Sequence, residues 1–405
     1  MRLSNVPAAV LVLVCAVEAV PTLDAYGWPW GLQDPNSVLT DVLAYEGLAK
    51  LAAYVVANGY PSPQKCTLDN VVVRSEWSTF STKQKQEYVD AVKCMAEKPA
   101  KSSRDSIPGA RNRYDDFVGV HINQTLSIHG TGNFLTWHRY FTWAYEQALR
   151  NECGYMGYQP YWNWPKYAKN PLASSLFDGS SASLGGNGAS RKEGDVNIPS
   201  NQVPSIVLPP QQGGGCVEPG YLNWTVNLGP VSPALNDTTP NKQPDGLAYN
   251  PRCLRRDISS YVTQQFLKDA DVSSSITNFS DIDSFQTYMQ GNGFTDPKFL
   301  GIHTGGHFVV GADPGGDLFS SPGDPYFYLH HAMIDRVYWT WQNMDVGPRS
   351  FGDNRLSGTI TVNNLPPSRN ATLEDIIDLG VNAEPITIEQ AMSTIGGTPF
   401  CYVYA

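Results

Sequence analysis

Charged residues are scarce in this chain. Only 16% of its 405 residues are Asp, Glu, Lys or Arg, and the formal net charge is −10. Binding to nucleic-acid phosphates needs clustered Lys and Arg, so this charge balance disfavours a nucleic-acid partner. Few charges together with 36 glycines and 30 prolines are typical of a loop-rich extracellular protein. Small neutral or cationic molecules are the ligands that this composition leaves open.

Long apolar runs are almost absent as well. One such run, Val6 to Val17, follows Arg2 and ends in Val17-Glu18-Ala19, where the small residues suit a signal-peptidase site. The run is too short for an ordinary membrane span, and no second candidate follows it. We therefore predict a signal peptide over residues 1–19 and a secreted chain without a membrane segment. An uncleaved N-terminal anchor is the alternative.

Cysteine is limited to seven residues. Loss of the signal peptide would remove Cys15 and leave six, namely Cys66, Cys94, Cys153, Cys216, Cys253 and Cys401. An even number in an oxidising compartment predicts three disulfides, although the sequence leaves their pairing open. Five asparagines stand in Asn-x-Ser/Thr sequons, which also favours secretion: Asn123, Asn223, Asn236, Asn278 and Asn370.

Histidine is equally scarce, but its distribution is informative. The seven histidines fall into an early group and a late group, namely His121, His129 and His138, then His303, His307, His330 and His331. A lone buried histidine is more often a hydrogen-bonded core residue than a ligand. Two groups that each supply at least three histidines are better explained as metal sites, since neutral imidazole is the commonest ligand for copper, zinc and iron. Three ligands on each ion also leave a position open for a small molecule.

The early group lies in a region with strong helix signals. Ser81 and Gln84 form a capping box, which predicts a first helix that begins at this point, upstream of the early histidines. A buried stripe at Tyr114, Phe117, Val118 and His121 predicts a second helix, with His121 facing inward at its end. Asn133 suits the start of a third helix that carries His138 on its apolar face. His129 would lie in the loop between the second and third helices, at residues 127–132.

The late group predicts two more helices. Pro297 suits a helix start before His303 and His307, which are four residues apart and therefore share one helix face. Pro325 suits the start of a helix that carries His330 and His331. His331 shares a face with Phe327, whereas His330 is turned about 100° away, so His331 is the better ligand and His330 the better packing residue.

The remaining segments predict loops and short strands. Residues 171–253 are rich in Gly, Ser, Pro and Asn, which favours surface excursions over a separate domain. The tail from Ser357 to Ala405 has two short β-like runs, Thr359 to Val362 and Tyr402 to Val403. The expected fold is mainly α, with long loops and a few short strands.

The ligand types restrict the metal. No Asp or Glu shares the histidine spacing, which disfavours magnesium, calcium and carboxylate-bridged iron, and no thiolate is offered for a blue-copper centre. All-imidazole sites suit zinc or copper. A zinc pair would indicate hydrolysis by an activated water, whereas a copper pair would bind dioxygen.

Two runs that contain histidines resemble a known family. Residues 134–139 (FLTWHR) and 323–336 (GDPYFYLHHAMIDR) are similar to the two copper signatures of the tyrosinase and catechol oxidase family. The segment from 74–77 (RSEW) to 91–94 (AVKC) resembles the short secreted fungal branch. The resemblance spans roughly residues 65–345 and implies a four-helix bundle that holds a coupled type 3 copper pair. It implies one copper ligated by His121, His129 and His138, and a second ligated by His303, His307 and His331.

The resemblance also implies how the domain is organised. We expect one catalytic domain over residues 20–405, without the C-terminal lid domain of longer relatives. Asp335 and Arg336, just after the last ligand, are expected to form a buried structural ion pair or hydrogen-bond pair. Trp137 is expected to pack in the core.

Three departures from the family pattern bear on activity. Many fungal members have a Cys two residues before the second histidine, where it bonds to that ring, but this chain has Ser127, so no thioether is expected. Members that hydroxylate monophenols often have Asn after the fourth ligand and an acidic residue three or four before it, where this chain has Thr304 and Leu300 or Phe299. Leu318, thirteen residues before His331, occupies the position that often shields the first copper.

The expected activity is oxidation of o-diphenols to o-quinones with reduction of dioxygen to water, with small phenols and catechols as substrates. Slow monophenol hydroxylation is expected because Leu318 leaves access to the first copper. The alternatives are a monophenol mono-oxygenase, a haemocyanin-like dioxygen carrier and a dizinc hydrolase. The oligomeric state stays open.

Overall fold

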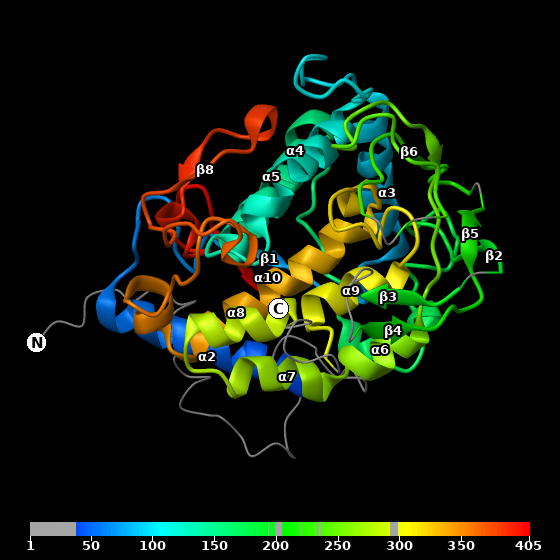
Figure 1. The fold of residues 1–405 in the computed structure, drawn as a ribbon. Coiled ribbons are helices and arrows are strands. Elements are labelled where there is room, and N and C mark those ends of the chain that lie inside the picture. The colour runs from blue at the N-terminus through cyan, green and yellow to red at the C-terminus, as the bar shows by residue number, and fades with distance from the viewer. Residues whose placement is uncertain are drawn as a thin grey trace, which may run out of the picture.

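A computed structural model describes residues 38–192, 194–198, 205–218, 220–232, 235, 237–291 and 299–405. The expected signal peptide, Cys15, the sequon at Asn236 and Pro297 lie outside the described residues. The described chain is mainly helical, with short strands and long loops, which confirms the expected fold class (Figure 1). In this part of the chain, no helix combines the length and the apolar character needed to cross a membrane.

The helices surround the positions of the histidines. They are α2 Leu39–Asn58, α3 Thr82–Glu97, α4 Arg113–Ile128, α5 Phe134–Cys153, α6 Ser260–Phe266, α7 Asp269–Thr277, α8 Ile282–Gln290, α9 Ile302–Val310 and α10 Tyr326–Met344. Helix α10 runs through the centre of the molecule and contacts α2, α5 and α9, while α4 lies beside α5 (Figure 1). The expected bundle of four histidine-bearing helices therefore consists of α4, α5, α9 and α10.

Local sequence signals begin several of these helices. Ser81 accepts a hydrogen bond from the Gln84 backbone N–H and Gln84 accepts one from Ser81, so the predicted capping box precedes α3. Pro325 directly precedes α10, as expected. Asn133 precedes α5, but its side chain accepts a hydrogen bond from Thr131 and does not cap the helix.

Two expected helix boundaries were wrong. Helix α4 continues past His121 to Ile128, because Ile122, Thr125 and Ile128 keep a buried face while Asn123, Leu126 and Ser127 face solvent. Helix α9 begins at Ile302, so Phe299 and Leu300 lie before it and outside the helix. His129, directly after α4, still lies in the connection to α5, as predicted.

The strands form two-stranded pairs outside the helical centre. They are β1 Val72–Arg74, β2 Gly188–Ser190, β3 Val196–Ile198, β4 Ile206–Leu208, β5 Gly214–Val217, β6 Thr225–Val226, β7 Arg252–Cys253, β8 Ile376–Ile377, β9 Ile386–Thr387 and β10 Tyr402–Tyr404. Antiparallel pairs β2–β5, β3–β4 and β6–β7 lie in the region 171–253, and loops join them in its described parts. Antiparallel β8–β9 lies in the tail.

The tail joins the core through one strand. Strand β10 pairs in parallel with β1, with Val72 opposite Tyr402, which confirms the β-like run at Tyr402 and Val403. The other predicted run was wrong: Thr359 makes a single bridge to Asn370, and a 3₁₀ turn follows at Val362–Asn364. Turn residues Asn363 and Asn364 adopt positive φ angles of 49° and 57°, which interrupt extended structure.

Six cysteines form three disulfides, as predicted. The pairs are Cys66–Cys401, Cys94–Cys153 and Cys216–Cys253. The first links the segment before β1 to the segment before β10, the second links α3 to α5, and the third closes part of the region 171–253. A disulfide stabilises mainly by restricting the unfolded chain, so the first pair, 335 residues apart, closes the longest loop.

Asp335 and Arg336 are buried and ion-paired, but not to each other. Asp335 accepts from Arg139 at 2.6 Å, whereas Arg336 donates to Asp41 at 2.8 Å. Consecutive residues on a helix point about 100° apart, so the two side chains reach different partners. Burial opposes ionisation of Asp335, but Arg139 and Arg74 hold its pKa below the ordinary value. The predicted pair therefore becomes two separate buried pairs.

Candidate metal centre

The early histidines are oriented by backbone carbonyls. The Nδ1 atom lies 2.7 Å from the Phe319 carbonyl oxygen in His121, 2.9 Å from that of Thr125 in His129, and 2.8 Å from that of Phe134 in His138. A carbonyl can only accept, so each Nδ1 carries the proton and donates. This tautomer leaves a lone pair on every Nε2, which is the form that binds a metal ion.

The three Nε2 lone pairs form one cluster. Each early histidine offers a ring nitrogen that lies within 4.8 Å of those of the other two. The Nε2 atoms of His121 and His138 are buried, and neither has a hydrogen-bond partner in the described part of the chain. Unpaired buried nitrogens are costly, so the three rings fit a bound cation that would satisfy them together.

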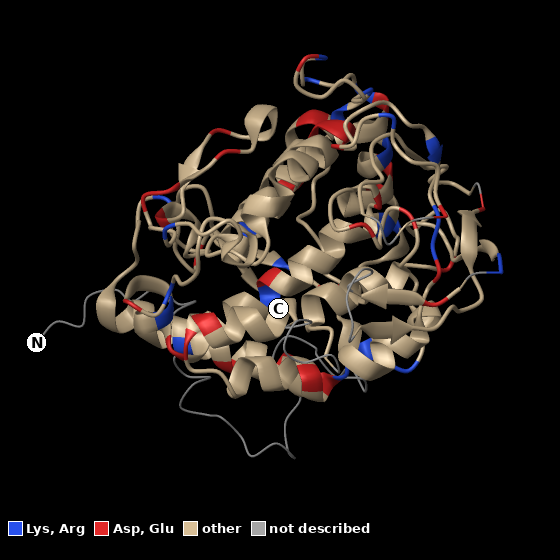
Figure 2. Cartoon of the chain, viewed as in Figure 1, with Lys and Arg blue, Asp and Glu red and all other residues tan. Residues whose placement is uncertain are grey.

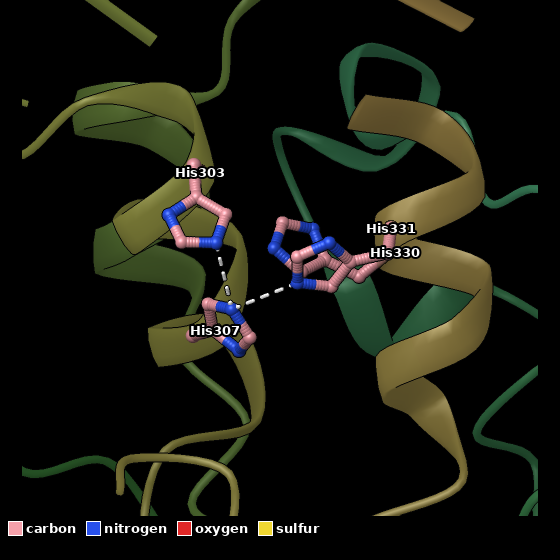
Figure 3. Close-up of side chains that lie close together, drawn as sticks. All are labelled: His303, His307, His330 and His331. Atoms are coloured by element: carbon pink, nitrogen blue, oxygen red, sulfur yellow. Dashed lines mark hydrogen bonds between the residues drawn. The ribbon is translucent and has the colours of Figure 1, made fainter. Parts of the chain in front are cut away.

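The late histidines form a second cluster on α9 and α10. His307 Nε2 lies 3.1 Å from His303 Nε2 and 3.2 Å from His331 Nε2, and the three rings converge in Figure 3. His303 and His307 extend from consecutive turns of α9, as the four-residue spacing predicts. Helix α9 carries no charged residue and is drawn entirely in tan in Figure 2.

The two clusters face each other. The His138 ring stacks on the His331 ring, with centroids 4.5 Å apart and planes 17° apart. His129 lies 5.8 Å from His303 between ring centroids. Four helices and one loop therefore bring residues 121–138 and 303–331 into one centre, as the resemblance implied.

His330 lies beside the second cluster but packs differently. Its ring stacks on Tyr326 with an interplanar angle of 8° and lies 5.3 Å from Trp164 between ring centroids. Neither ring nitrogen has a hydrogen-bond partner in the described residues, although the His303 backbone is close enough to offset part of the effect of burial. A ring nitrogen of His330 also lies within 4.8 Å of those of the cluster.

Burial keeps all seven imidazoles neutral. It lowers the pKa of His129 to about 4 and that of His330 to about 3. Burial is also the largest cause of the lowered pKa values of the other five histidines, and mutual repulsion between the charged forms adds to it. Neutral nitrogen donors without a carboxylate among them fit copper or zinc, and do not fit magnesium or calcium.

A cavity of about 550 Å³ opens onto both clusters. His129, His303 and His307 line it, and so does Leu318, whose side chain is 43% exposed. Leu318 therefore lies on an exposed part of the cavity lining. Trp137, by contrast, is buried and stacks on Phe141 with centroids 4.7 Å apart, which confirms its packing role.

The positions that differ from hydroxylating relatives are also at the cavity. Thr304 lines it, but its hydroxyl donates to the Gln290 backbone carbonyl at 2.8 Å. Of the two alternatives for the acidic position, Leu300 lines the cavity, while Phe299 packs against the core outside the lining. Neither position offers a carboxylate or an amide to this space.

Gln290 links the two halves of the centre, and the sequence did not indicate it. Its Oε1 accepts from the Gly130 backbone N–H at 2.7 Å, directly after His129, while its carbonyl binds Thr304, directly after His303. Gly130 has φ +58°, and a Cβ there would lie 2.5 Å from the Asn363 Oδ1 atom. The absence of a side chain at Gly130 therefore allows Asn363 to pack against the backbone there. In the sequence, only the Gly130-Thr131-Gly132 run hints at this close packing.

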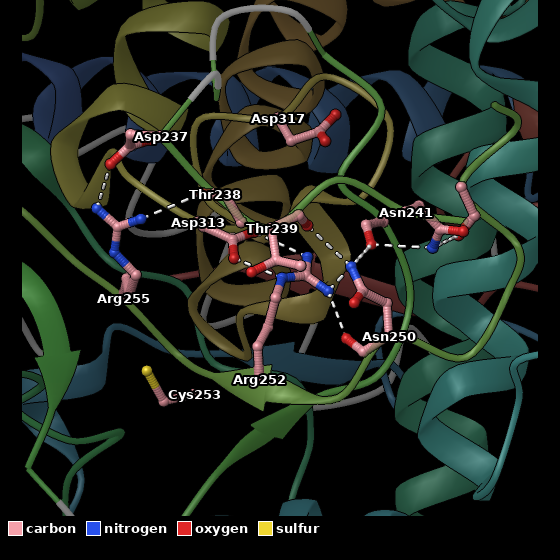
Figure 4. A network of polar contacts seen from close by, with 12 residues as sticks. Asp237, Thr238, Thr239, Asn241, Asn250, Arg252, Cys253, Arg255, Asp313 and Asp317 are labelled. Atoms are coloured by element: carbon pink, nitrogen blue, oxygen red, sulfur yellow. Dashed lines mark hydrogen bonds and ion pairs between the residues drawn. The ribbon is translucent and has the colours of Figure 1, made fainter. Parts of the chain in front are cut away.

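A polar network holds the loop that orients His121. Arg252 forms a bidentate ion pair with Asp313, and Arg255 binds Asp237 at 2.6 Å (Figure 4). Asp317 accepts from the backbone N–H groups of Val231, Ser232, Phe319 and Ser320. Because the Phe319 carbonyl holds His121 Nδ1, this network reaches the early cluster through the backbone.

Comparison with known proteins identifies the family. Residues 111–344 match the family model described as the common central domain of tyrosinase. The chain belongs to the tyrosinase family. This result confirms the resemblance, and a dinuclear copper centre is what the family implies. The two all-histidine clusters fit it.

Relatives of this tyrosinase-family chain include fungal oxidases. The tyrosinase-like protein orsC of Emericella nidulans is 42% identical over 76% of this chain and 84% of its own length. The N-acetyl-6-hydroxytryptophan oxidase ivoB of the same fungus is 36% identical over 88% of this chain and 98% of its own. A polyphenol oxidase (mutant G292N) from Thermothelomyces thermophila has a similar structure, with TM-score 0.82 and 42% identity over 90% of this chain and 97% of that one.

Proposed function

We propose that this protein is a dicopper oxidase that converts o-diphenols to o-quinones while dioxygen is reduced to water. The observation that carries the proposal is the pair of facing three-imidazole clusters at the base of an open cavity. When bound, a copper pair supplies dioxygen binding and electron transfer at this position. The chain supplies the donors, their orientation and the space for the substrate.

We assign His121, His129 and His138 to one copper ion, and His303, His307 and His331 to the other. His331 is preferred over His330 because its Nε2 lies 3.2 Å from His307 Nε2 and its ring stacks on His138 of the other cluster. The His330 ring also lies near His307, with centroids 4.6 Å apart, but it stacks on Tyr326 and not on a ring of the other cluster. The backbone carbonyls at the early histidines fix which nitrogen points to the metal, which strengthens ligation.

The cavity supports diphenols as the preferred substrates. A monophenol must lose a proton before oxidation, and a positioned general base is worth about 10² to 10⁴ in rate. Thr304 donates its hydroxyl to a backbone carbonyl and Leu300 is apolar, so neither position offers the carboxylate or amide that would activate a water as that base. Catechols are more acidic and need no oxygen insertion, so they depend less on such a base.

The open cavity also favours an enzyme over a dioxygen carrier, because a carrier needs a centre closed to phenols. The relative named for N-acetyl-6-hydroxytryptophan supports substrates beyond simple phenols. Secretion remains part of the proposal. Three disulfides and the exposure of the four described sequon asparagines, Asn123, Asn223, Asn278 and Asn370, support it.

The test is oxygen uptake on 4-methylcatechol and 4-methylphenol, with copper and zinc measured in the same sample. We expect copper in both clusters and a diphenol rate at least about 10² above the monophenol rate. Leu318→Phe, which narrows the entrance, should lower the monophenol rate first. Equal rates on the two substrates would refute the preference for diphenols, and an excess of zinc in active protein would refute the dicopper assignment.

A further inference from the structure

Helix α8 presents one polar face to the cavity. Asp283, Gln286, Thr287 and Gln290 all line it, at the i, i+3, i+4 and i+7 spacing of a single helix face. The opposite face of α8, with Phe285 and other apolar residues, is buried. The residues therefore form a continuous polar stripe along the cavity, which we call the α8 stripe.

The α8 stripe starts beside the histidines and runs away from them. Gln290 contacts Gly130, next to His129, at 2.7 Å. Asp283 lies seven residues earlier, and a helix rises about 1.5 Å per residue, so the two positions are roughly 10 Å apart along the axis. A substrate whose ring approaches His303 and His307 can therefore extend a substituent along the stripe towards Asp283. The cavity volume of about 550 Å³ lies in the range of sites that hold molecules larger than one ring.

The charge at the outer end of the stripe is negative. None of the described residues that line the cavity is Lys or Arg, and its only carboxylates are those of Asp283 and Asp317. Asp317 is buried and its oxygens accept backbone N–H groups. Asp283 is exposed, and its side chain accepts a hydrogen bond from Ser357 at 3.1 Å. Its carboxylate can therefore meet a charged group on a substrate.

Apolar side chains also line the cavity, alongside uncharged polar ones. Ile198 and Ile206 of the β3–β4 pair contribute, together with Phe308 and Leu318. These side chains can cover an aromatic or aliphatic substituent, but they cannot compensate a charge. Discrimination by charge would then depend on the α8 stripe.

We propose that the α8 stripe selects catechols with a cationic substituent over those with a carboxylate, and that the Asp283 carboxylate discriminates between the two charges. This inference rests on the proposed oxidase function and names its substrate class. A cation near Asp283 gains a favourable contact, whereas a carboxylate meets a like charge with no described basic residue in the lining to offset it. Gln286 donates to the Ser357 carbonyl and Gln290 accepts from the Gly130 N–H, so these two side chains are held in place between the ring and the charged end.

The test compares three catechols with one ring and different substituents: 2-aminoethyl, methyl and 2-carboxyethyl. The wild-type protein should prefer the amine over the acid in kcat/KM, and added salt should reduce the preference. Asp283→Asn should lower the amine-to-acid ratio about two- to fivefold, mainly through KM, because exposed ion pairs are worth little individually. The kcat/KM for the methyl substrate should change less than that for either charged substrate. Glu97→Gln is the matched control, since it removes an exposed carboxylate on α3 that is not part of the cavity lining.

Binding of 2-phenylethylamine and 3-phenylpropionate, which carry no oxidisable hydroxyl, separates this inference from the proposed activity. If no catechol is oxidised but Asp283→Asn still lowers the amine-to-acid binding ratio, only the oxidase proposal fails. If catechols are oxidised and the ratio does not change in Asp283→Asn, or changes equally in Glu97→Gln, the role of Asp283 is overturned. A wild-type preference for the acid would overturn the substrate class.

Discussion

The two histidine clusters are built by different means. In the early cluster, a backbone carbonyl holds Nδ1 of every ring, at 2.7 to 2.9 Å. In the late cluster, Nε2 of His307 contacts Nε2 of both His303 and His331, and Nδ1 of His331 has no hydrogen-bond partner in the described chain. The first set of rings is held by the backbone, whereas the second depends more on packing between α9 and α10.

The two clusters should respond differently to the removal of one histidine. Backbone carbonyls stay in place when one side chain is removed, so the remaining rings of the early cluster should keep their orientation. Rings that support one another lose that support when one is removed. The early cluster should therefore tolerate the loss of one ligand better than the late cluster.

Removing one ligand from each cluster gives the largest expected effect. His138→Ala and His307→Ala should each weaken copper binding at the altered cluster by at least about 100-fold and abolish oxidase activity. His307→Ala should lose more copper, because His307 Nε2 contacts both His303 and His331. Copper content per chain, measured after dialysis, checks the ranking. Equal losses would remove the distinction between the clusters.

The adjacent pair on α10 tests which ring belongs to the late cluster. His331→Ala should remove copper from that cluster, whereas His330→Ala should retain most of it and mainly reduce stability by opening a space beside Trp164 and Tyr326. Copper content and thermal unfolding of the two variants distinguish these outcomes. Greater copper loss in His330→Ala would show that the assignment of the two rings must be reversed.

Sequence alone predicted the parts of the centre that depend on local signals. Neighbouring residues set three of these features: the apolar stripe of α4, the spacing of His303 and His307, and the start of α10 after Pro325. The predicted end of α4 was wrong. Asn123 and Ser127 are residue types typical of loops, but a helix can carry polar residues on its solvent-exposed face. Such boundaries are decided by burial, which short-range patterns do not report.

The parts that were not predicted depend on contacts between distant segments. The carbonyl that orients His121 belongs to Phe319, 198 residues away, and a carbonyl has no residue-specific signature. Gln290 likewise reaches Gly130 across 160 residues. The partners of Asp335 and Arg336 were missed for the same reason, since Arg139 and Asp41 lie elsewhere in the chain.

The packing between α9 and α10 can be tested at one glycine. A Cβ at Gly306 would lie 2.0 Å from Cε1 of His330, so Gly306→Ala should displace that ring or separate the helices, at a cost of about 1–3 kcal/mol. Gly305→Ala is the control, since its Cβ would meet Phe266 at 3.3 Å, a much milder approach. Denaturant unfolding of the metal-free proteins measures both. Similar stability of the two variants would mean that α9 and α10 can move apart at this contact with little loss of unfolding free energy.

The smallest expected effect concerns the backbone that holds the early cluster. Asp317 accepts from the Phe319 N–H at 2.8 Å, and the Phe319 carbonyl holds His121 Nδ1. Asp317→Asn replaces one acceptor oxygen by a donor, so one pair of backbone N–H groups loses its partner and the Phe319 carbonyl becomes less fixed. We expect copper binding at the early cluster to weaken about tenfold, with binding at the late cluster unchanged. This is the lower end of the range of effects seen when a residue that orients a metal ligand is replaced.

Asp353→Asn removes the same charge from an exposed position and should leave copper affinity unaltered. Titration of the metal-free protein with copper, followed as two separate binding steps, makes the comparison. Equal weakening of both steps would mean that Asp317 stabilises the fold in general and does not act through His121.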